Sequence, residues 1–189
     1  MTLSSHDDRT TQSPAFTTWQ FWAIAAIVIA MDFVSKSMAV ESLSPLHVPH
    51  RIVGDVLRFT LAYNPGAAFG MHVGAASRWI FGALSIVIVV VLLRATADLT
   101  RISRVAAIGV PIVVGGAIGN LLDRIRHREG VVDFIDVGFG DVRFWTFNVA
   151  DSAVTIGACC LIFALWQQER AHSARAGAPS ERAERQSNA

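Results

Sequence analysis

Two aspartates lie beside long apolar runs, where a carboxylate is costly. Asp133 follows two valines in Val-Val-Asp-Phe-Ile, and Asp151 ends the segment Phe-Asn-Val-Ala-Asp at the start of the last apolar run. A carboxyl group kept beside so much apolar surface points to chemistry rather than folding. Two such groups within hydrogen-bonding reach repel each other as anions, so the pair holds one proton near neutral pH. The ionised member can then take a proton from water while the protonated member polarises a carbonyl group, as in aspartic proteases.

Asp151 alone is weak evidence for this chemistry. It falls in the first turn of a predicted helix, where an aspartate commonly serves as a cap and faces the positive end of the helix dipole. Asp133 lies in the preceding loop. If that loop folds back toward Asp151, the two carboxyl groups form a pair, and a catalytic role then explains them better than a helix cap. Asn148, three residues before Asp151, should point its polar atoms at the carboxyl pair. The sequence leaves open which aspartate carries the proton.

Other catalytic groups fit less well. The chain has no Gly-x-Ser-x-Gly and no His-Glu-x-x-His segment. His47 and His50 share a loop without a third metal ligand, so we expect no metal and no cofactor. Lys36 is the only lysine and in principle suits a serine–lysine mechanism. Asp32 lies four residues earlier on the same helical face, however, and we expect an ion pair that holds Lys36 protonated.

The composition identifies a membrane protein. Of 189 residues, 52% are hydrophobic and only 16% are charged, which is too apolar for a soluble domain of this length. The net charge is +1 and the arginines are scattered, so we expect no nucleic-acid partner. Cys159 and Cys160 are neighbours in an apolar run and point in different directions on a helix. They are therefore predicted to be small buried side chains rather than a disulfide.

Four apolar stretches have the length of about 17 to 25 residues that a membrane-spanning helix requires. They lie near residues 18–40, 76–94, 104–122 and 149–167. The first has no basic leader and runs past the length of a signal-peptide core, so it is predicted to be a retained helix. Residues 1–17 and 169–189 are too polar to bury a core and are predicted to be disordered tails flanking a membrane domain over 18–168.

Four spans place both tails on one side of the membrane and the connections 41–75 and 123–148 on the other. The arginines divide almost evenly between the two sides, so charge does not decide the orientation. Within the connections, residues 55–64 and 141–147 are rich in β-branched and aromatic side chains and are bounded by glycines. This pattern predicts short strands, and hence a small sheet at the membrane surface.

Two further segments offer polar groups. Asn64 opens Asn-Pro-Gly-Ala-Ala-Phe, whose small residues would let a substrate backbone pass close by. The glycines of Gly115-Gly-Ala-Ile-Gly119 allow close helix packing. Packing does not explain Asn120, Asp123 and Arg124, which follow at the end of the same predicted helix. Asp123 can brace neighbouring polar groups, and Arg124 can hold a carbonyl oxygen or a lipid phosphate.

Four segments in this order resemble one known family. Asn64–Phe69, Gly115–Arg124, Val131–Phe134 and Phe147–Ser152 together resemble lipoprotein signal peptidase, also called signal peptidase II, over residues 18–168. The resemblance implies an α-helical polytopic membrane protein with four transmembrane helices and a small outer-face β-sheet lobe. It also implies the bacterial inner membrane, cytoplasmic termini and an active site at the outer face.

The activity that the resemblance implies is that of an aspartic endopeptidase. Its substrates would be diacylglyceryl-modified prolipoproteins, which it would cut just before the lipidated cysteine. The enzyme would be a monomer surrounded by phospholipid, and globomycin-like peptides would inhibit it. Asp133 and Asp151 would be catalytic, and the polar residues with a structural role would be Asp32, Lys36 and Asp123. Substrate would be bound by Asn64, Gly66, Ala67, Ala68, Phe69, Asn120, Arg124, Asn148 and Ala150. The chain departs from the family pattern at Phe33 and at Trp145-Thr146.

Two other classes of protein stay open. Paired intramembrane acids also relay protons in transporters and channels, which place them near the bilayer midplane and often within inverted repeats. Here the acids gather at one predicted face and no repeat is visible. A noncatalytic lipid-binding assembly factor would need the small-residue faces and Arg124 but not both aspartates, so replacing each aspartate separates it from a protease.

Overall fold

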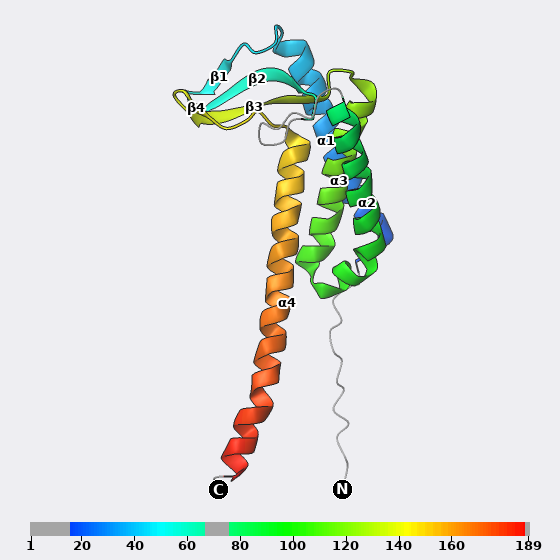
Figure 1. The fold of residues 1–189 in the computed structure, drawn as a ribbon, viewed down its shortest axis with the longest axis vertical. Coiled ribbons are helices and arrows are strands. Elements are labelled where there is room, and N and C mark those ends of the chain that lie inside the picture. Colours follow the sequence, from blue (N-terminus) through cyan, green and yellow to red (C-terminus); the bar gives the residue numbers. More distant parts are fainter. Residues whose placement is uncertain (1–15, 67–75, 188–189) are drawn as a thin grey trace, which may run out of the picture.

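The structure is a computed structural model that describes residues 16–66 and 76–187, with side chains up to residue 173. Within these residues the helices are α1 (Thr18–Ser42), α2 (Ser77–Ile102), α3 (Arg104–Arg126) and α4 (Val149–Ser187) (Figure 1). Each contains a stretch long and apolar enough to cross a membrane. The predicted helical membrane architecture is therefore confirmed.

Helix α4 continues well past the predicted end of its span at residue 167, to Ser187. Its membrane-spanning candidate segment ends earlier, at Ser173. The disordered tail expected over 169–189 stays a prediction.

Helix α3 lies at the centre of the helical part. In its most apolar segment 61% of the residues are buried, against 6% in α2. Small residues make this position possible, because a Cβ atom on Gly115 would lie 2.8 Å from Cβ of Val28 in α1. A Cβ atom on Gly116 would lie 2.5 Å from the carbonyl oxygen of Ala150 in α4. The glycines thus let two neighbouring helices approach the α3 backbone, as the sequence predicted.

A sheet caps one end of the helices. Its strands are β1 (His50–Val53), β2 (Leu57–Asn64), β3 (Val131–Phe139) and β4 (Val142–Arg143), all paired antiparallel in the order β1-β2-β3-β4. The predicted small sheet is confirmed, and the strand expected over 55–64 is β2.

The sheet differs from the prediction around Asp133. This residue lies on the nine-residue strand β3 rather than in a loop, because the β-branched residues around it pair with β2. The strand expected over 141–147 is shorter, since β4 covers only Val142–Arg143 and Phe147 contributes a single bridge to Ile135.

An apolar cluster joins the sheet to the helices. It consists of Ala39 and Leu43 at the end of α1, Leu61 of β2, and Val132 and Phe134 of β3. None of these residues has more than 8% of its surface exposed. In Figure 1 the sheet lies across one end of the helices, and α4 runs away from it along its whole length. The cluster therefore fixes β3 above the helix ends.

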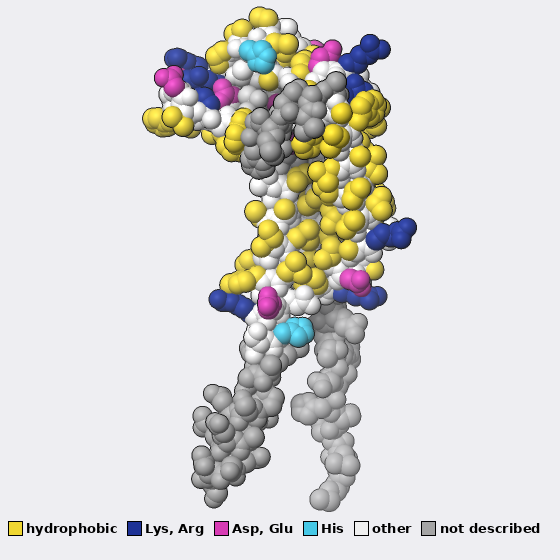
Figure 2. Space-filling model, viewed as in Figure 1, with side chains coloured by type: hydrophobic (Ala, Val, Ile, Leu, Met, Phe, Trp, Pro, Cys, Tyr) yellow, Lys and Arg dark blue, Asp and Glu magenta, His cyan; other side chains and the backbone are white. Residues whose placement is uncertain are grey.

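The outer surface of the helices is apolar. Figure 2 shows hydrophobic side chains covering the visible face between the sheet and the opposite end, where charged groups gather. Exposed members on the four helices include Ile27, Val87, Ile108 and Ile162. A band of this kind is what a lipid-facing surface requires, and it accompanies the four candidate spans.

We predict that Gly116→Ala destabilises the protein by about 1–3 kcal/mol, because the added methyl group must separate α3 from the start of α4. Gly82→Ala in α2 is the matched control, since its Cβ atom would meet nothing closer than 3.8 Å. The measurement is thermal unfolding of both variants in detergent. Equal melting temperatures for the two variants would contradict the predicted contact.

Candidate active site

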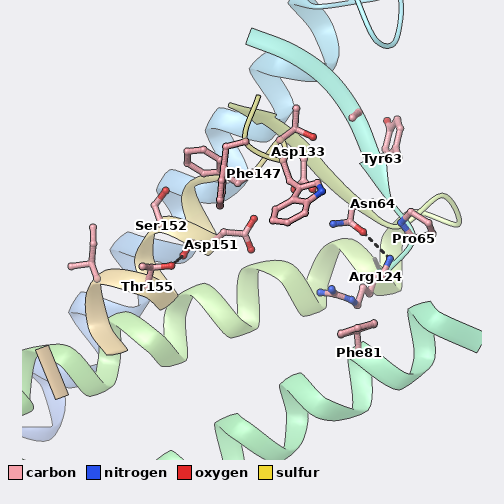
Figure 3. A pocket seen from close by; sticks show the side chains of 16 residues that line it. Tyr63, Asn64, Pro65, Phe81, Arg124, Asp133, Phe147, Asp151, Ser152 and Thr155 are labelled. Atoms are coloured by element: carbon pink, nitrogen blue, oxygen red, sulfur yellow. Dashed lines mark hydrogen bonds between the residues drawn. The ribbon is translucent and has the colours of Figure 1, made fainter. Parts of the chain in front are cut away.

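A cavity of about 790 Å³ lies where the sheet meets the helix ends. Figure 3 shows side chains from β2, β3, α2, α3 and α4 converging on it. Asp133 and Asp151 both line it, so the structure brings the two predicted residues into one cavity. Its other lining residues are Ala62, Tyr63, Asn64, Pro65, Gly66, Phe81, Arg124, Phe144, Trp145, Thr146, Phe147, Ser152, Thr155 and Ile156.

Asp133 is a buried carboxyl on strand β3. It is 2% exposed, and its Oδ1 accepts a 2.7 Å hydrogen bond from Nδ2 of Asn148. Burial is the largest cause that raises its pKa, to about 7, and the charge of Asp151 raises it further. Hydrogen bonds from Asn148 and Asn64, and the charge of Lys36, act in the opposite direction. Asp133 can therefore hold a proton close to neutral pH.

Asp151 lies in the first turn of α4 and is only partly buried. Its Oδ1 accepts a 2.7 Å hydrogen bond from Nδ2 of Asn120, and its Oδ2 accepts one of 3.2 Å from the backbone N–H of Asn148. In return, the backbone N–H of Asp151 donates to Oδ1 of Asn148 at 2.9 Å. The cap expected from the sequence is therefore present, and the same carboxylate also faces the cavity.

Two further predicted residues line the cavity. Asn64 ends β2, and its Oδ1 accepts a 2.9 Å hydrogen bond from the backbone N–H of Gly66, which has a φ of +109°. Arg124 ends α3, and its guanidinium donates to the carbonyl oxygen of Asn120 at 3.0 Å. Its buried Nε has no hydrogen-bond partner among the described residues. Arg124 thus lines the cavity while its guanidinium is held against the end of α3.

The three residues predicted to be structural form one buried cluster. Nζ of Lys36 lies 2.7 Å from Oδ2 of Asp32 and 2.9 Å from Oδ2 of Asp123. Asp123 also accepts a 3.1 Å hydrogen bond from the backbone N–H of Val132, next to Asp133. Asp32 accepts one of 2.9 Å from the backbone N–H of Ala150, next to Asp151. The cluster thus anchors the backbone beside both aspartates.

The remaining residues predicted to bind substrate are not seen to line the cavity. Asn120, Asn148 and Ala150 do not line the cavity and instead lie buried behind it. Ala67, Ala68 and Phe69 fall outside the described residues. Among the described residues, no group of three potential metal ligands occurs.

Sequence reasoning missed several lining residues on α4 and α2. Thr155 follows Asp151 by four positions and therefore lies on the same side of the helix, and Ser152 and Ile156 flank the two residues. That spacing was a readable signal. Phe81 comes from α2, far away in the sequence, and no local pattern marks it.

A four-span protein with two carboxyls in a cavity at its helix ends has the features of a membrane-embedded hydrolase. A comparison with family models matches residues 24–167 to signal peptidase (SPase) II. The chain therefore belongs to the signal peptidase II family and is a peptidase.

Individual relatives agree with this assignment. The lipoprotein signal peptidase of Coxiella burnetii (strain Dugway 5J108-111) is 39% identical over 147 residues, covering 76% of this chain and 88% of the relative. That of Hydrogenovibrio crunogenus is 37% identical over 177 residues, covering 88% and 96%. A solved bacterial membrane enzyme superposes with a TM-score of 0.67 at 28% identity, covering 80% of this chain and 90% of that one.

The raised pKa of Asp133 predicts how stability changes with pH. The unfolded chain releases this proton near 3.8, whereas the folded protein keeps it to about pH 7. Between these values folding binds a proton, so the free energy of unfolding falls by about 1.4 kcal/mol per pH unit for this group. We expect the melting temperature of the wild type to fall relative to that of Asp133→Asn as the pH rises from 4 to 7.

The measurement is thermal unfolding in detergent across this pH range. Asp141→Asn serves as the control, because Asp141 is exposed and lies outside the cavity. A constant difference between wild type and Asp133→Asn over the whole range would show that Asp133 is not protonated in the folded protein.

Proposed function

We propose that this protein is an aspartic endopeptidase that removes signal peptides from diacylglyceryl-modified bacterial prolipoproteins, cutting just before the lipidated cysteine. The observation that carries the proposal is that Asp133 and Asp151 line one cavity at the helix ends. Membership of the signal peptidase II family supports the substrate class. The relatives named above are lipoprotein signal peptidases, which supports it further.

The two carboxyl groups supply the acid and the base that peptide hydrolysis needs. One carboxylate takes a proton from water while the water oxygen bonds to the scissile carbonyl carbon, and the other carboxyl gives its proton to the carbonyl oxygen. Collapse of the resulting diol then breaks the carbon–nitrogen bond. The carboxyl group that took the proton of water gives it to the leaving amine nitrogen, and the other carboxylate recovers a proton from a hydroxyl of the diol. No metal or cofactor takes part in these steps.

The lining of the cavity suits a substrate that is both peptide and lipid. Phe81, Phe144 and Ile156 provide apolar surface, and Arg124 can bind a carbonyl oxygen or a phosphate through its guanidinium. Asn64 and Gly66, with the neighbouring segment 67–69, would hold the peptide backbone beside the aspartates. Asn120, Asn148 and Ala150 would support this site from behind.

The location of the site supports a membrane-surface reaction. A bond at the surface is best attacked at helix ends, where water reaches the carboxyls and lipid tails do not. The enzyme would lie in the bacterial inner membrane as a monomer, with cytoplasmic termini and the sheet on the outer face. Phospholipid would surround the apolar band described above.

We predict that the purified protein cleaves a diacylglyceryl-modified prolipoprotein, and that Asp133→Asn and Asp151→Asn each lower the rate by at least about a hundredfold. Each variant removes one proton-transfer group while keeping the shape of the side chain. Gel shift and mass spectrometry identify the product, whose first residue should be the modified cysteine.

Two controls accompany this assay. An unmodified prolipoprotein should remain uncut, and Asp141→Asn should keep wild-type activity because Asp141 is exposed away from the cavity. Full activity in either aspartate variant, or no cleavage by a well-folded wild type, would overturn the proposal. A proton-flux assay in vesicles would then test the proton-relay alternative.

A further inference from the structure

Lys36 is a buried charge that the proposed reaction does not use. It lies in α1, is 3% exposed, and does not line the cavity. Its ammonium group contacts three acceptors, at 2.7 Å (Asp32), 2.9 Å (Asp123) and 3.0 Å (Oδ1 of Asn120). Three acceptors match its three N–H bonds, so every donor of the ammonium group is occupied.

The contact with Asn120 sets the direction of that side-chain amide. An ammonium group only donates, so it requires the amide oxygen, and the NH2 group must turn the other way. There it donates to Oδ1 of Asp151 at 2.7 Å. A reversed amide would place NH2 against the ammonium group of Lys36 and its oxygen against the carboxylate of Asp151. Both contacts would be repulsive, so Lys36 and Asp151 together hold one orientation.

The amide of Asn148 is oriented in the same way. Its Oδ1 accepts the backbone N–H of Asp151 at 2.9 Å, which leaves its NH2 group for the opposite side. That group donates to Oδ1 of Asp133 at 2.7 Å and lies 3.1 Å from Oδ1 of Asn120. A continuous hydrogen-bond chain therefore runs from Lys36 through two amides to both aspartates.

The two carboxyl groups differ in their surroundings. Both oxygens of Asp151 accept N–H groups, from Asn120 and from the backbone of Asn148. Asp151 also lies in the first turn of α4, where the helix dipole favours an anion, and it is partly exposed. Asp133 lies 2% exposed on β3, between the buried residues Val132 and Phe134, where an anion is poorly solvated.

We propose that Lys36 is a positioning residue that fixes the amides of Asn120 and Asn148, and that the resulting network keeps Asp151 ionised and leaves the shared proton on Asp133. This inference rests on the proposed function and assigns roles within it. Asp151 is the base that takes the proton of water, and Asp133 is the acid that gives its proton to the scissile carbonyl oxygen.

Several charged or titratable groups surround the pair. They come from α1, α3 and β2 and are Lys36, Asp32, Asp123, Arg124 and Tyr63. Since Asp32 and Asp123 neutralise Lys36, its main effect on the pair is the orientation of the amides. Its remaining charge still favours the ionised form of Asp133.

Infrared spectroscopy tests the location of the proton without any substrate. At about pH 5.5, between the ordinary pKa of an aspartate and that of buried Asp133, Asp151→Asn should retain the C=O band of a protonated carboxyl. Asp133→Asn should lack that band, because the inferred site of the proton is gone. The opposite pattern would assign the proton to Asp151 and overturn the inference, whether or not the protein cleaves prolipoproteins.

Kinetics test the positioning role. Asn120→Leu keeps the branched shape of the side chain, removes its hydrogen-bonding groups and leaves Lys36 paired with Asp32 and Asp123. We expect kcat to fall about 10- to 100-fold, with KM changed less than about threefold, because the carboxyl pair loses its orientation while the substrate contacts remain. A raised KM with unchanged kcat would make Asn120 a substrate contact instead.

Lys36→Met gives an independent readout in the pH dependence of kcat/KM. The wild type should lose activity as the pH rises through about 7, where Asp133 loses its proton. Removing the charge of Lys36 should move this decline to higher pH by about 0.5 to 1 unit, because the ionised form of Asp133 loses a favourable interaction. Ser35→Ala, on the same helix, is the control, since the Ser35 hydroxyl donates to the backbone carbonyl of Asp32 and to no other group among the described residues.

The outcomes separate the two proposals. No cleavage by the wild type would overturn the proposed function, while the infrared bands would still report where the proton lies. An active wild type whose kcat is unchanged in both Lys36→Met and Asn120→Leu would overturn the positioning role. If Lys36→Met does not fold, the kcat and KM of Asn120→Leu decide the question.

Discussion

The buried ion cluster around Lys36 is the interaction on which the rest of the structure depends. One ammonium group joins α1 to α3 through Asp123, and Asp123 in turn accepts the N–H of Val132 in β3. Asp32, paired with the same ammonium group, accepts the N–H of Ala150 in α4. Burying these charges is expensive, and losing one partner of such a pair commonly costs about 3–5 kcal/mol. The cluster therefore acts less as a source of stability than as a constraint on where four elements can lie.

The constraint matters because the carboxyl pair is itself unfavourable. Asp133 is buried, and the charge of Asp151 further disfavours its ionised form. A backbone free to relax would move the two residues apart and let water reach both. The residues next to them, Val132 and Ala150, are instead tied to the Lys36 cluster. Packing of the glycine face of α3 against α4 adds a second restraint at the same place.

The sequence predicted the spans, the pair and the ion pair for identifiable reasons. A continuous apolar run of membrane length is rarely found in a water-exposed segment, so the runs themselves identify the spans. The spacing of four residues between Asp32 and Lys36 places the two side chains on one helical face, where they can pair. Strand β3 was not predicted, because its pairing with β2 joins residues far apart in the chain and no local pattern encodes that contact. The two hydrogen bonds of Asn120, to Lys36 and to Asp151, were not predicted either, because they join residues of three helices that are far apart in the chain.

The register of the sheet shows how finely the position of Asp133 is set. Phe59 pairs with Ile135, whereas Ala62 pairs with Asp133, so β2 contains one extra residue between these pairs. Residues paired across antiparallel strands point to the same face, and so do residues two apart along a strand. Asn64 and Ala62 therefore share the face of Asp133, and Asn64 can reach its carboxyl group.

If the same sequence paired without the bulge, the register of the first pairs would continue and Ala62 would lie opposite Val132. Asn64 would then point to the other face of the sheet, away from Asp133. The bulge in β2 thus brings the Asn-Pro-Gly segment and the β3 carboxyl to the same side of the sheet. The proposed catalytic arrangement at the end of the helical bundle consequently depends on a one-residue irregularity in a strand outside it.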